Sequence, residues 1–195
     1  GATGSVGLAT LDLIDRAEPG RFEIIALTAH RNASGLAELA IRHRAGFVAI
    51  GDPAAADELR EALRGHPEIE IGIGAEAIVE AARRPAAWTM AAIVGAAGLK
   101  PTLEALRQGH ALAFANKECL VCAGALFMRE AMACGTRLLP VDSEHNAVFQ
   151  VFDFERRDAI RAITLTASGG PFRTWPFERM RNARREDALA HPTWD

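Results

Sequence analysis

Two carboxylates, Asp142 and Glu144, stand one residue apart where an apolar run over 137–141 gives way to an apolar helical pattern over 144–152. Residues two apart in an extended segment point to the same side, so both acids can face one point in space. At the carboxyl edge of a parallel sheet, open α/β proteins bind their ligands. Carboxylate oxygens suit hard cations such as Mg²⁺ and Mn²⁺. The pair therefore predicts a divalent-metal site, and helix capping by the same acids is the alternative.

Glycines also recur at every third position from Gly1 through Gly4 to Gly7, directly before a helical run over 8–14. Glycine lets the backbone approach a pyrophosphate, and a helix N-terminus offers unpaired N–H groups and a partial positive charge. We interpret this stretch as a nucleotide phosphate loop whose preceding strand is missing. The alternative is an ordinary glycine-rich turn.

The next predicted strand, over 23–28, is followed by His30, Arg31 and Asn32 and by no acid. NAD-dependent enzymes place Asp or Glu at this point to hold the ribose 2′-hydroxyl, whereas an arginine accommodates the 2′-phosphate of NADP. The pattern favours NADP. A surface arginine at the start of a helix is the alternative.

A further predicted strand, over 111–115, runs into Asn116, Lys117 and Glu118. These residues place an amide, a cation and an acid at the same sheet edge as Asp142. Lys117 can contact a substrate oxygen and Glu118 a cofactor hydroxyl. A polar helix cap with an acid in its first turn explains the same residues equally well.

Short apolar runs alternate with amphipathic helical runs along the chain, which predicts a parallel sheet wrapped by helices on both faces. The predicted strands cover residues 23–28, 47–50, 70–73, 89–94, 111–115, 137–141 and 162–167. The predicted helices cover residues 6–16, 33–44, 54–64, 75–82, 100–108, 117–133, 144–152 and 177–189. Because the regular alternation stops near residue 141, we expect one domain over 1–141 and an incomplete second domain over 142–195.

The overall composition is that of a soluble globular protein: 195 residues, 49% hydrophobic and 24% charged, with a net charge of −3. This charge gives no sign of a nucleic-acid partner, and no apolar run is long enough to span a membrane. Three cysteines fit a reducing compartment, so we expect a cytoplasmic protein. The chain begins inside a strand-to-helix turn and stops without a closing element, which predicts a fragment.

Together these motifs, with Ile93–Leu99, Ser168–Phe172 and His191–Trp194, resemble the 1-deoxy-D-xylulose 5-phosphate reductoisomerase family over the whole chain and in family order. The resemblance implies an α/β fold, with a Rossmann-like NADP-binding domain that lacks its first strand and the start of an α+β catalytic domain. It also implies NADPH and Mg²⁺, Mn²⁺ or Co²⁺ as cofactors, a sugar-phosphate substrate and a homodimer when full length.

The resemblance further implies roles for individual residues. The cofactor contacts are Thr3, Gly4, Ser5, Val6, His30, Arg31, Asn32, Asn116 and Glu118. The metal ligands are Asp142 and Glu144, which with Lys117 form the catalytic set. The substrate contacts are Lys117, Ser143, Glu144, Ser168 and His191, with Trp194 on a loop that closes over the substrate.

The implied reaction is the isomeroreduction of 1-deoxy-D-xylulose 5-phosphate to 2-C-methyl-D-erythritol 4-phosphate, a step of isoprenoid precursor biosynthesis. We expect this fragment to be inactive by itself, because further ligands of the site would follow residue 195. Two alternatives remain open: another NADP-dependent dehydrogenase with two domains, in which the acid pair only caps a helix, and a nucleotide-binding module without catalysis.

Overall fold

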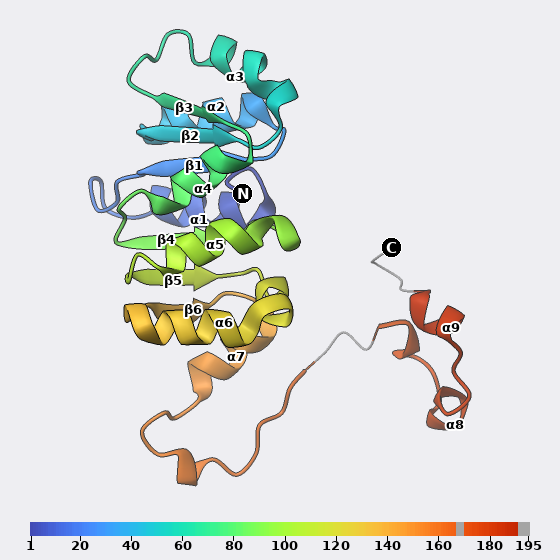
Figure 1. Ribbon diagram of the computed structural model, residues 1–195. Coiled ribbons are helices and arrows are strands. Elements are labelled where there is room, and N and C mark those ends of the chain that lie inside the picture. The colour runs from blue at the N-terminus through green and yellow to red at the C-terminus, as the bar shows by residue number, and fades with distance from the viewer. Residues whose placement is uncertain (167–169, 191–195) are drawn as a thin grey trace. The chain divides into compact units, whose positions relative to one another are not determined.

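The computed structural model describes residues 1–166 and 170–190 and divides into two compact units, 1–142 and 143–195 (Figure 1). Six strands lie in the first unit: β1 (Ala26–Ala29), β2 (Phe47–Ile50), β3 (Glu70–Ile73), β4 (Trp88–Ala91), β5 (Ala111–Phe114) and β6 (Arg137–Pro140). Its α-helices are α1 (Ser5–Asp15), α2 (Ala33–His43), α3 (Ala56–Ala62), α4 (Ala75–Arg83), α5 (Leu99–Leu106) and α6 (Glu118–Cys134). Two short 3-10 turns, η1 (Pro53–Ala55) and η2 (Ala96–Gly98), precede α3 and α5.

The strands form two separate three-stranded parallel sheets, β1-β2-β3 and β4-β5-β6. Figure 1 shows them side by side, with β1 and β4 as the facing edges. The sequence predicts one doubly wound sheet without its first strand. The α/β class and the parallel pairing are confirmed, but no ladder joins β1 to β4, so the six strands do not form one continuous sheet.

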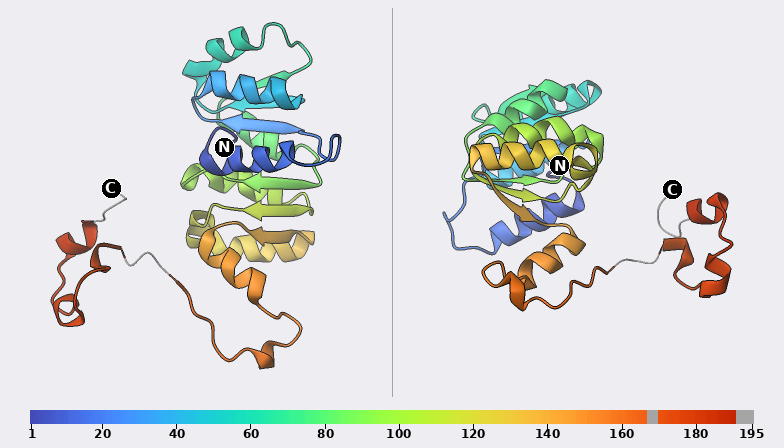
Figure 2. Two further views of the ribbon diagram at one scale, coloured as in Figure 1. Left: turned by 180° about the vertical axis from the view of Figure 1, so that it is seen from behind. Right: turned by 60° about the horizontal axis from the view of Figure 1, so that its bottom comes forward.

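Helices cover both faces of the strands, as Figure 2 shows from behind and from below. α4 lies against β1, β2 and β3, and α5 packs between α4 and α6 on that same face. α1 and α2 lie on the opposite face, where α3 packs against α2. This winding is the double-sided cover that alternating strands and helices predict.

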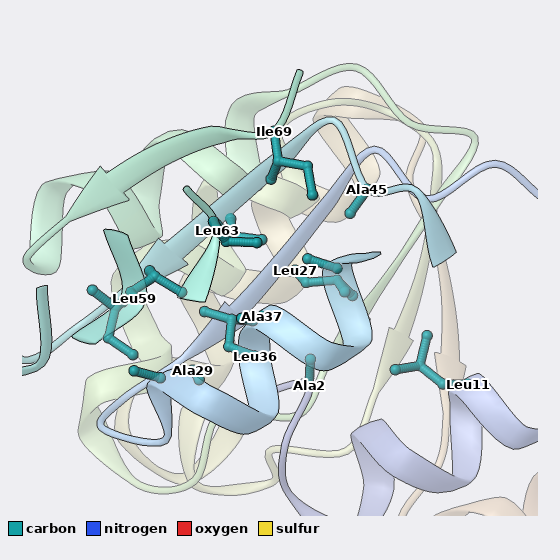
Figure 3. Close-up of a cluster of buried hydrophobic side chains, with 14 residues drawn as sticks. Ala2, Leu11, Leu27, Ala29, Leu36, Ala37, Ala45, Leu59, Leu63 and Ile69 are labelled. Carbon is teal, nitrogen blue, oxygen red and sulfur yellow. The ribbon is translucent and has the colours of Figure 1, made fainter. Parts of the chain in front are cut away.

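Each sheet has its own hydrophobic core. The core of the first sheet packs β1 and β2 against α2 and α3, with Leu36, Val48, Ile50 and Leu59 fully buried (Figure 3). The core of the second sheet lies between β5, α5 and α6. There the rings of Phe114 and Phe127 pack with their centroids 6.0 Å apart. Burying this apolar surface is the main stabilising contribution in each half.

The second unit has less regular structure. Its elements are α7 (Ser143–Val151), η3 (Arg157–Ala159), η4 (Gly170–Phe172), α8 (Phe177–Met180) and α9 (Arg185–Leu189). None of its described residues is buried. The predicted strand over 162–167 is wrong for residues 162–166, which form no regular structure, and the predicted helix over 177–189 is two short helices. Among the described residues, no helix is long and apolar enough to cross a membrane.

Candidate functional site

The carboxyl ends of the strands lie level within each sheet. Ala29 at the end of β1 is in register with Ile50, and Phe114 at the end of β5 is in register with both Ala91 and Pro140. Because the strands are parallel, the segments that follow them emerge at one edge of each sheet. These segments contain all the described candidate residues except the glycine loop and the residues after Asp142.

The glycine loop over 1–4 leads into α1 with an uncapped helix start. Gly4 is the N-cap in an extended conformation, no side chain caps it, and no acid lies in the first turn of the helix. A Cβ on Gly7 would lie 2.5 Å from the Ala2 carbonyl oxygen, so only glycine allows the first turn to pack on the loop. Ser5 and Gly4 are exposed. An eleven-residue helix with free N–H groups and no local negative charge can receive a phosphate.

After β1, the candidate 2′-phosphate residues His30, Arg31 and Asn32 are all exposed. The Asn32 side chain caps α2 by accepting a hydrogen bond from the Gly35 N–H at 2.9 Å. The Nε of Arg31 donates to Asp52 Oδ2 at 2.8 Å, while the Arg31 side chain stays 76% exposed. The hydrogen bond from Nε thus orients the guanidinium group, and its remaining N–H groups can bind an anion.

Asp52 is a site residue that the sequence does not reveal. It follows β2, where a hydrogen bond from the Ala54 backbone N–H and the neighbouring Arg31 guanidinium together lower the pKa of its carboxyl group. The sequence shows only an Asp before Pro53, which is typical of a helix cap. Its pairing with Arg31, 21 residues earlier, requires the parallel register of β1 and β2.

Asn116, a candidate cofactor contact, has a buried side chain that forms three hydrogen bonds with the backbone. Its Nδ2 donates to the carbonyl oxygens of Ile93 and Gly95, and its Oδ1 accepts from the Cys119 N–H at 3.1 Å. The side chain therefore ties the loop after β4 to the start of α6. Gly98 belongs to the same arrangement, because a Cβ there would lie 2.5 Å from the Ile93 carbonyl oxygen. In the sequence, only the spacing of Gly95 and Gly98 indicates that the loop after β4 packs closely against Asn116.

Lys117 and Glu118 begin α6, with Lys117 as its N-cap residue and Glu118 in its first turn. Both side chains are exposed. The helix carries no side-chain cap from Lys117, and Glu118 lies where the helix dipole favours an acid. This arrangement is compatible with both interpretations of the motif, contact with a ligand and simple capping.

Asp142 is the last residue of the first unit and lies two residues after the end of β6. The N–H of the preceding residue, Val141, donates to the Phe114 carbonyl oxygen at 2.9 Å. Ser143 and Glu144 lie in the first turn of α7, and both acids are half-buried. Among the described residues, no three His, Cys, Asp or Glu side chains gather where they could hold a metal ion. The two carboxylates fit a hard cation in their chemistry, and in number they supply part of its coordination shell.

The remaining candidate residues, Ser168, His191 and Trp194, lie outside the described residues.

The parallel strands, the helices on both faces and the glycine loop before α1 define a Rossmann-like nucleotide-binding unit. The sequence profile of 1-deoxy-D-xylulose 5-phosphate reductoisomerase matches residues 1–124, and the profile of its C-terminal domain matches residues 138–195. The chain therefore belongs to the 1-deoxy-D-xylulose 5-phosphate reductoisomerase family, as its motifs predict.

Over the aligned residues, curated relatives are more than half identical to the chain. The reductoisomerase of Rhodopseudomonas palustris (strain BisB18) is 55% identical over 194 residues, which cover 100% of this chain and 47% of that protein. The reductoisomerase of Rhodospirillum centenum is 56% identical over 100% of this chain and 48% of its own length. The chain thus spans about half the length of the curated relatives it matches.

Solved structures agree with this assignment. The reductoisomerase from Zymomonas mobilis in complex with NADPH superposes with a TM-score of 0.85 and 54% identity, over 92% of this chain and 47% of that one. A DOX-P reductoisomerase in complex with NADPH, fosmidomycin and magnesium gives a TM-score of 0.81 and 36% identity, over 100% of this chain and 50% of that one.

Proposed function

We propose that the full-length protein converts 1-deoxy-D-xylulose 5-phosphate into 2-C-methyl-D-erythritol 4-phosphate with NADPH and a divalent cation, Mg²⁺, Mn²⁺ or Co²⁺. Membership of the family supports this activity. The observation that carries it in this chain is that three candidate residues follow the carboxyl ends of parallel strands, Arg31 in the first sheet and Lys117 and Asp142 in the second. A phosphate-binding cation, a substrate-binding cation and a metal-binding acid are the three groups that this reaction requires.

The first unit would hold the cofactor. The N–H groups of Thr3, Gly4, Ser5 and Val6 would receive the pyrophosphate at the start of α1. Arg31 would pair with the 2′-phosphate, with His30 beside it and Asp52 orienting its guanidinium. Asn32 would position this loop by capping α2.

The second sheet would meet the other end of the cofactor. Glu118, exposed at the start of α6, would accept a hydrogen bond from a cofactor hydroxyl. Asn116 would contact the cofactor through its Oδ1, which accepts one hydrogen bond within the protein, while its Nδ2 holds the loop over 93–95 in place.

Substrate and metal would be held at the end of β6 and the start of α7. Asp142 and Glu144 would ligate the divalent cation, which when bound supplies Lewis acidity and a template for the substrate oxygens. Lys117 would neutralise negative charge on a substrate oxygen. Ser143, Ser168 and His191 would contact the substrate, and Trp194 would lie on the loop that excludes water. NADPH would supply the hydride that reduces an aldehyde formed by rearrangement of the carbon skeleton, and the residues named above would hold the cofactor and the substrate in place.

The protein would work in the cytoplasm and as a homodimer. The three cysteines support a reducing compartment, because Cys119, Cys122 and Cys134 are all free thiols. The homodimer rests on the family resemblance alone.

The Asp142→Asn variant of the full-length protein tests the proposal. Asparagine keeps the shape of the side chain and removes the negative charge that a hard cation requires. We expect turnover to fall by about a thousandfold or more, because a catalytic metal contributes several kcal/mol to transition-state stabilisation. NADPH affinity, measured by isothermal titration, should change by less than about twofold.

Asp57→Asn is the matched control. Asp57 lies on α3 with its side chain 97% exposed, and its substitution removes the same charge from a residue that has no part in the proposed site. Its turnover should equal that of the unchanged protein. Full activity of Asp142→Asn without added metal would support a metal-independent dehydrogenase instead, and equal loss of activity and NADPH binding would indicate a folding role for Asp142.

A further inference from the structure

The first turn of α6 carries two cysteines with opposite environments. Cys119 is buried in the core of the second sheet, whereas Cys122, three residues later, is exposed. A short loop joins this turn to β5, so a C-x-x-C pair lies at the start of a helix that follows a parallel strand. A C-x-x-C pair in such a βα arrangement is typical of thiol–disulfide chemistry. Neither thiol has a part in the proposed reaction.

The backbone brings the two cysteines close enough for a disulfide. Residues three apart in an α-helix have Cα atoms about 5 Å apart, within the range of about 4.4–6.8 Å that a disulfide allows. The turn is also tightened, because the Lys117 carbonyl oxygen accepts from the Leu120 N–H at 3.0 Å as well as from the Val121 N–H at 3.2 Å. The first of these bonds is of the 3-10 type, in which side chains three apart lie on the same side.

A break in the helix separates this turn from the rest of α6. Ala123, directly after Cys122, has φ −146° and ψ 30°, which lie outside the helical range. The Cβ atoms of a disulfide lie about 3.8 Å apart, closer than those of helix residues three apart, so the turn must contract when the bond forms. The break at Ala123 allows the turn over 119–122 to contract while the longer part of α6, over 124–134, keeps its packing.

The environments of the two thiols set the order in which they react. Burial raises the pKa of the Cys119 thiol, against a hydrogen bond with Thr102 that lowers it, so this thiol stays protonated and is shielded from solvent. The exposed Cys122 thiol is the one that an oxidant in solution reaches first. Cys119 then lies one turn away as the resolving thiol, which is the arrangement of redox-sensing cysteines.

We propose that Cys119 and Cys122 are a redox modification site that a hydroperoxide converts into a disulfide. The Cys122 sulfur attacks the peroxide, the O–O bond breaks, and a sulfenic acid forms with release of the alcohol, or of water from hydrogen peroxide. The Cys119 sulfur then attacks the Cys122 sulfur, so the S–S bond forms, the S–O bond breaks, and water leaves with the Cys119 proton. Two thiols and one hydroperoxide thus give one disulfide, one alcohol and one water. In a reducing compartment the bond is transient, because dithiols restore the two thiols.

The disulfide acts on the cofactor site through Asn116. In the reduced protein the Cys119 N–H donates to Asn116 Oδ1 at 3.1 Å, and the same side-chain amide holds the loop over 93–95. Contraction of the turn shifts this N–H and draws the Cys119 side chain out of the core. This consequence rests on the proposed function, in which Asn116 and Glu118 contact NADPH. Oxidation therefore weakens NADPH binding, by about tenfold for the loss of one hydrogen bond, and a dithiol reverses the change.

Treatment of the full-length protein with hydrogen peroxide tests the site itself. Cys122→Ser is the test variant, and Cys134→Ser is the matched control at the other end of the same helix. Trypsin releases residues 118–129 as one peptide, which should lose two hydrogens on oxidation in the unchanged protein and in Cys134→Ser, as measured by mass spectrometry. Cys122→Ser should show no such loss. A disulfide to Cys134, or oxidation of Cys122 to a sulfinic acid without a disulfide, overturns the proposal.

Isothermal titration with NADPH measures the consequence in the reduced protein, after oxidation, and again after dithiothreitol. We expect about tenfold weaker binding after oxidation in the unchanged protein and in Cys134→Ser, recovery with the dithiol, and no change in Cys122→Ser. Equal affinity in the two redox states, with the disulfide formed, overturns the link through Asn116. A reduced protein that does not bind NADPH contradicts the proposed function instead, whereas the mass of the peptide still decides the disulfide.

Discussion

The two sheets of the first unit hold their candidate residues in different ways. After the first sheet, His30 and Arg31 are exposed, Asn32 caps the helix that follows them, and Arg31 pairs with Asp52. After the second sheet, Asn116 is buried, and its amide bonds to three backbone groups of the protein. We interpret this as a difference between residues that are available to a ligand and a residue that holds two loops together. Substitutions in the first sheet should therefore change affinity, and those around Asn116 should change stability.

Among the substitutions that affect NADPH affinity, we expect the largest effect from Gly7→Ala. The added methyl group would lie 2.5 Å from the Ala2 carbonyl oxygen, so the loop and the first turn of α1 must separate. The loss of two or more hydrogen bonds to the pyrophosphate weakens NADPH by about a hundredfold or more. Isothermal titration of the full-length protein measures this change. Gly124→Ala is the control, since a Cβ there meets nothing within 4 Å, and unchanged affinity in both variants would contradict the loop assignment.

Substitutions of two asparagines test this difference between the sheets. Asn116→Ala leaves the Ile93 and Gly95 carbonyl oxygens and the Cys119 N–H without their partner, which should lower the free energy of unfolding by about 3 kcal/mol. Asn32→Ala removes only the cap of α2 and should cost about 1 kcal/mol. Urea unfolding followed by circular dichroism gives both values. Equal losses would show that the two sheets do not differ in the way described.

The sequence predicts the βα order well because each element carries its own local pattern. The run over 47–50 is apolar and lies between turn residues, and β2 occupies those residues. The predicted strand over 162–167 had the same local composition, but the described residues of the second unit offer no strand for it to pair with. Pairing is a property of the whole fold, and a window of six residues does not contain it.

The sequence also predicts only part of the candidate site. Arg31 and Asn116 stand out in the sequence because each is a polar residue directly after an apolar run. The sequence cannot show that Asp52 orients Arg31, or that the amide of Asn116 faces inward, since both depend on which strands become neighbours.

The preference of Arg31 for a 2′-phosphate is the central claim of this account. It is tested most directly by the ratio of the NADPH and NADH dissociation constants in the full-length protein, with and without Arg31→Ala. We expect the variant to weaken NADPH by about tenfold and to leave NADH unchanged, because only NADPH carries the 2′-phosphate. Arg60→Ala is the matched control, since Arg60 makes the same kind of 2.8 Å ion pair with Asp57 on α3. Equal weakening of both cofactors by Arg31→Ala would contradict the account.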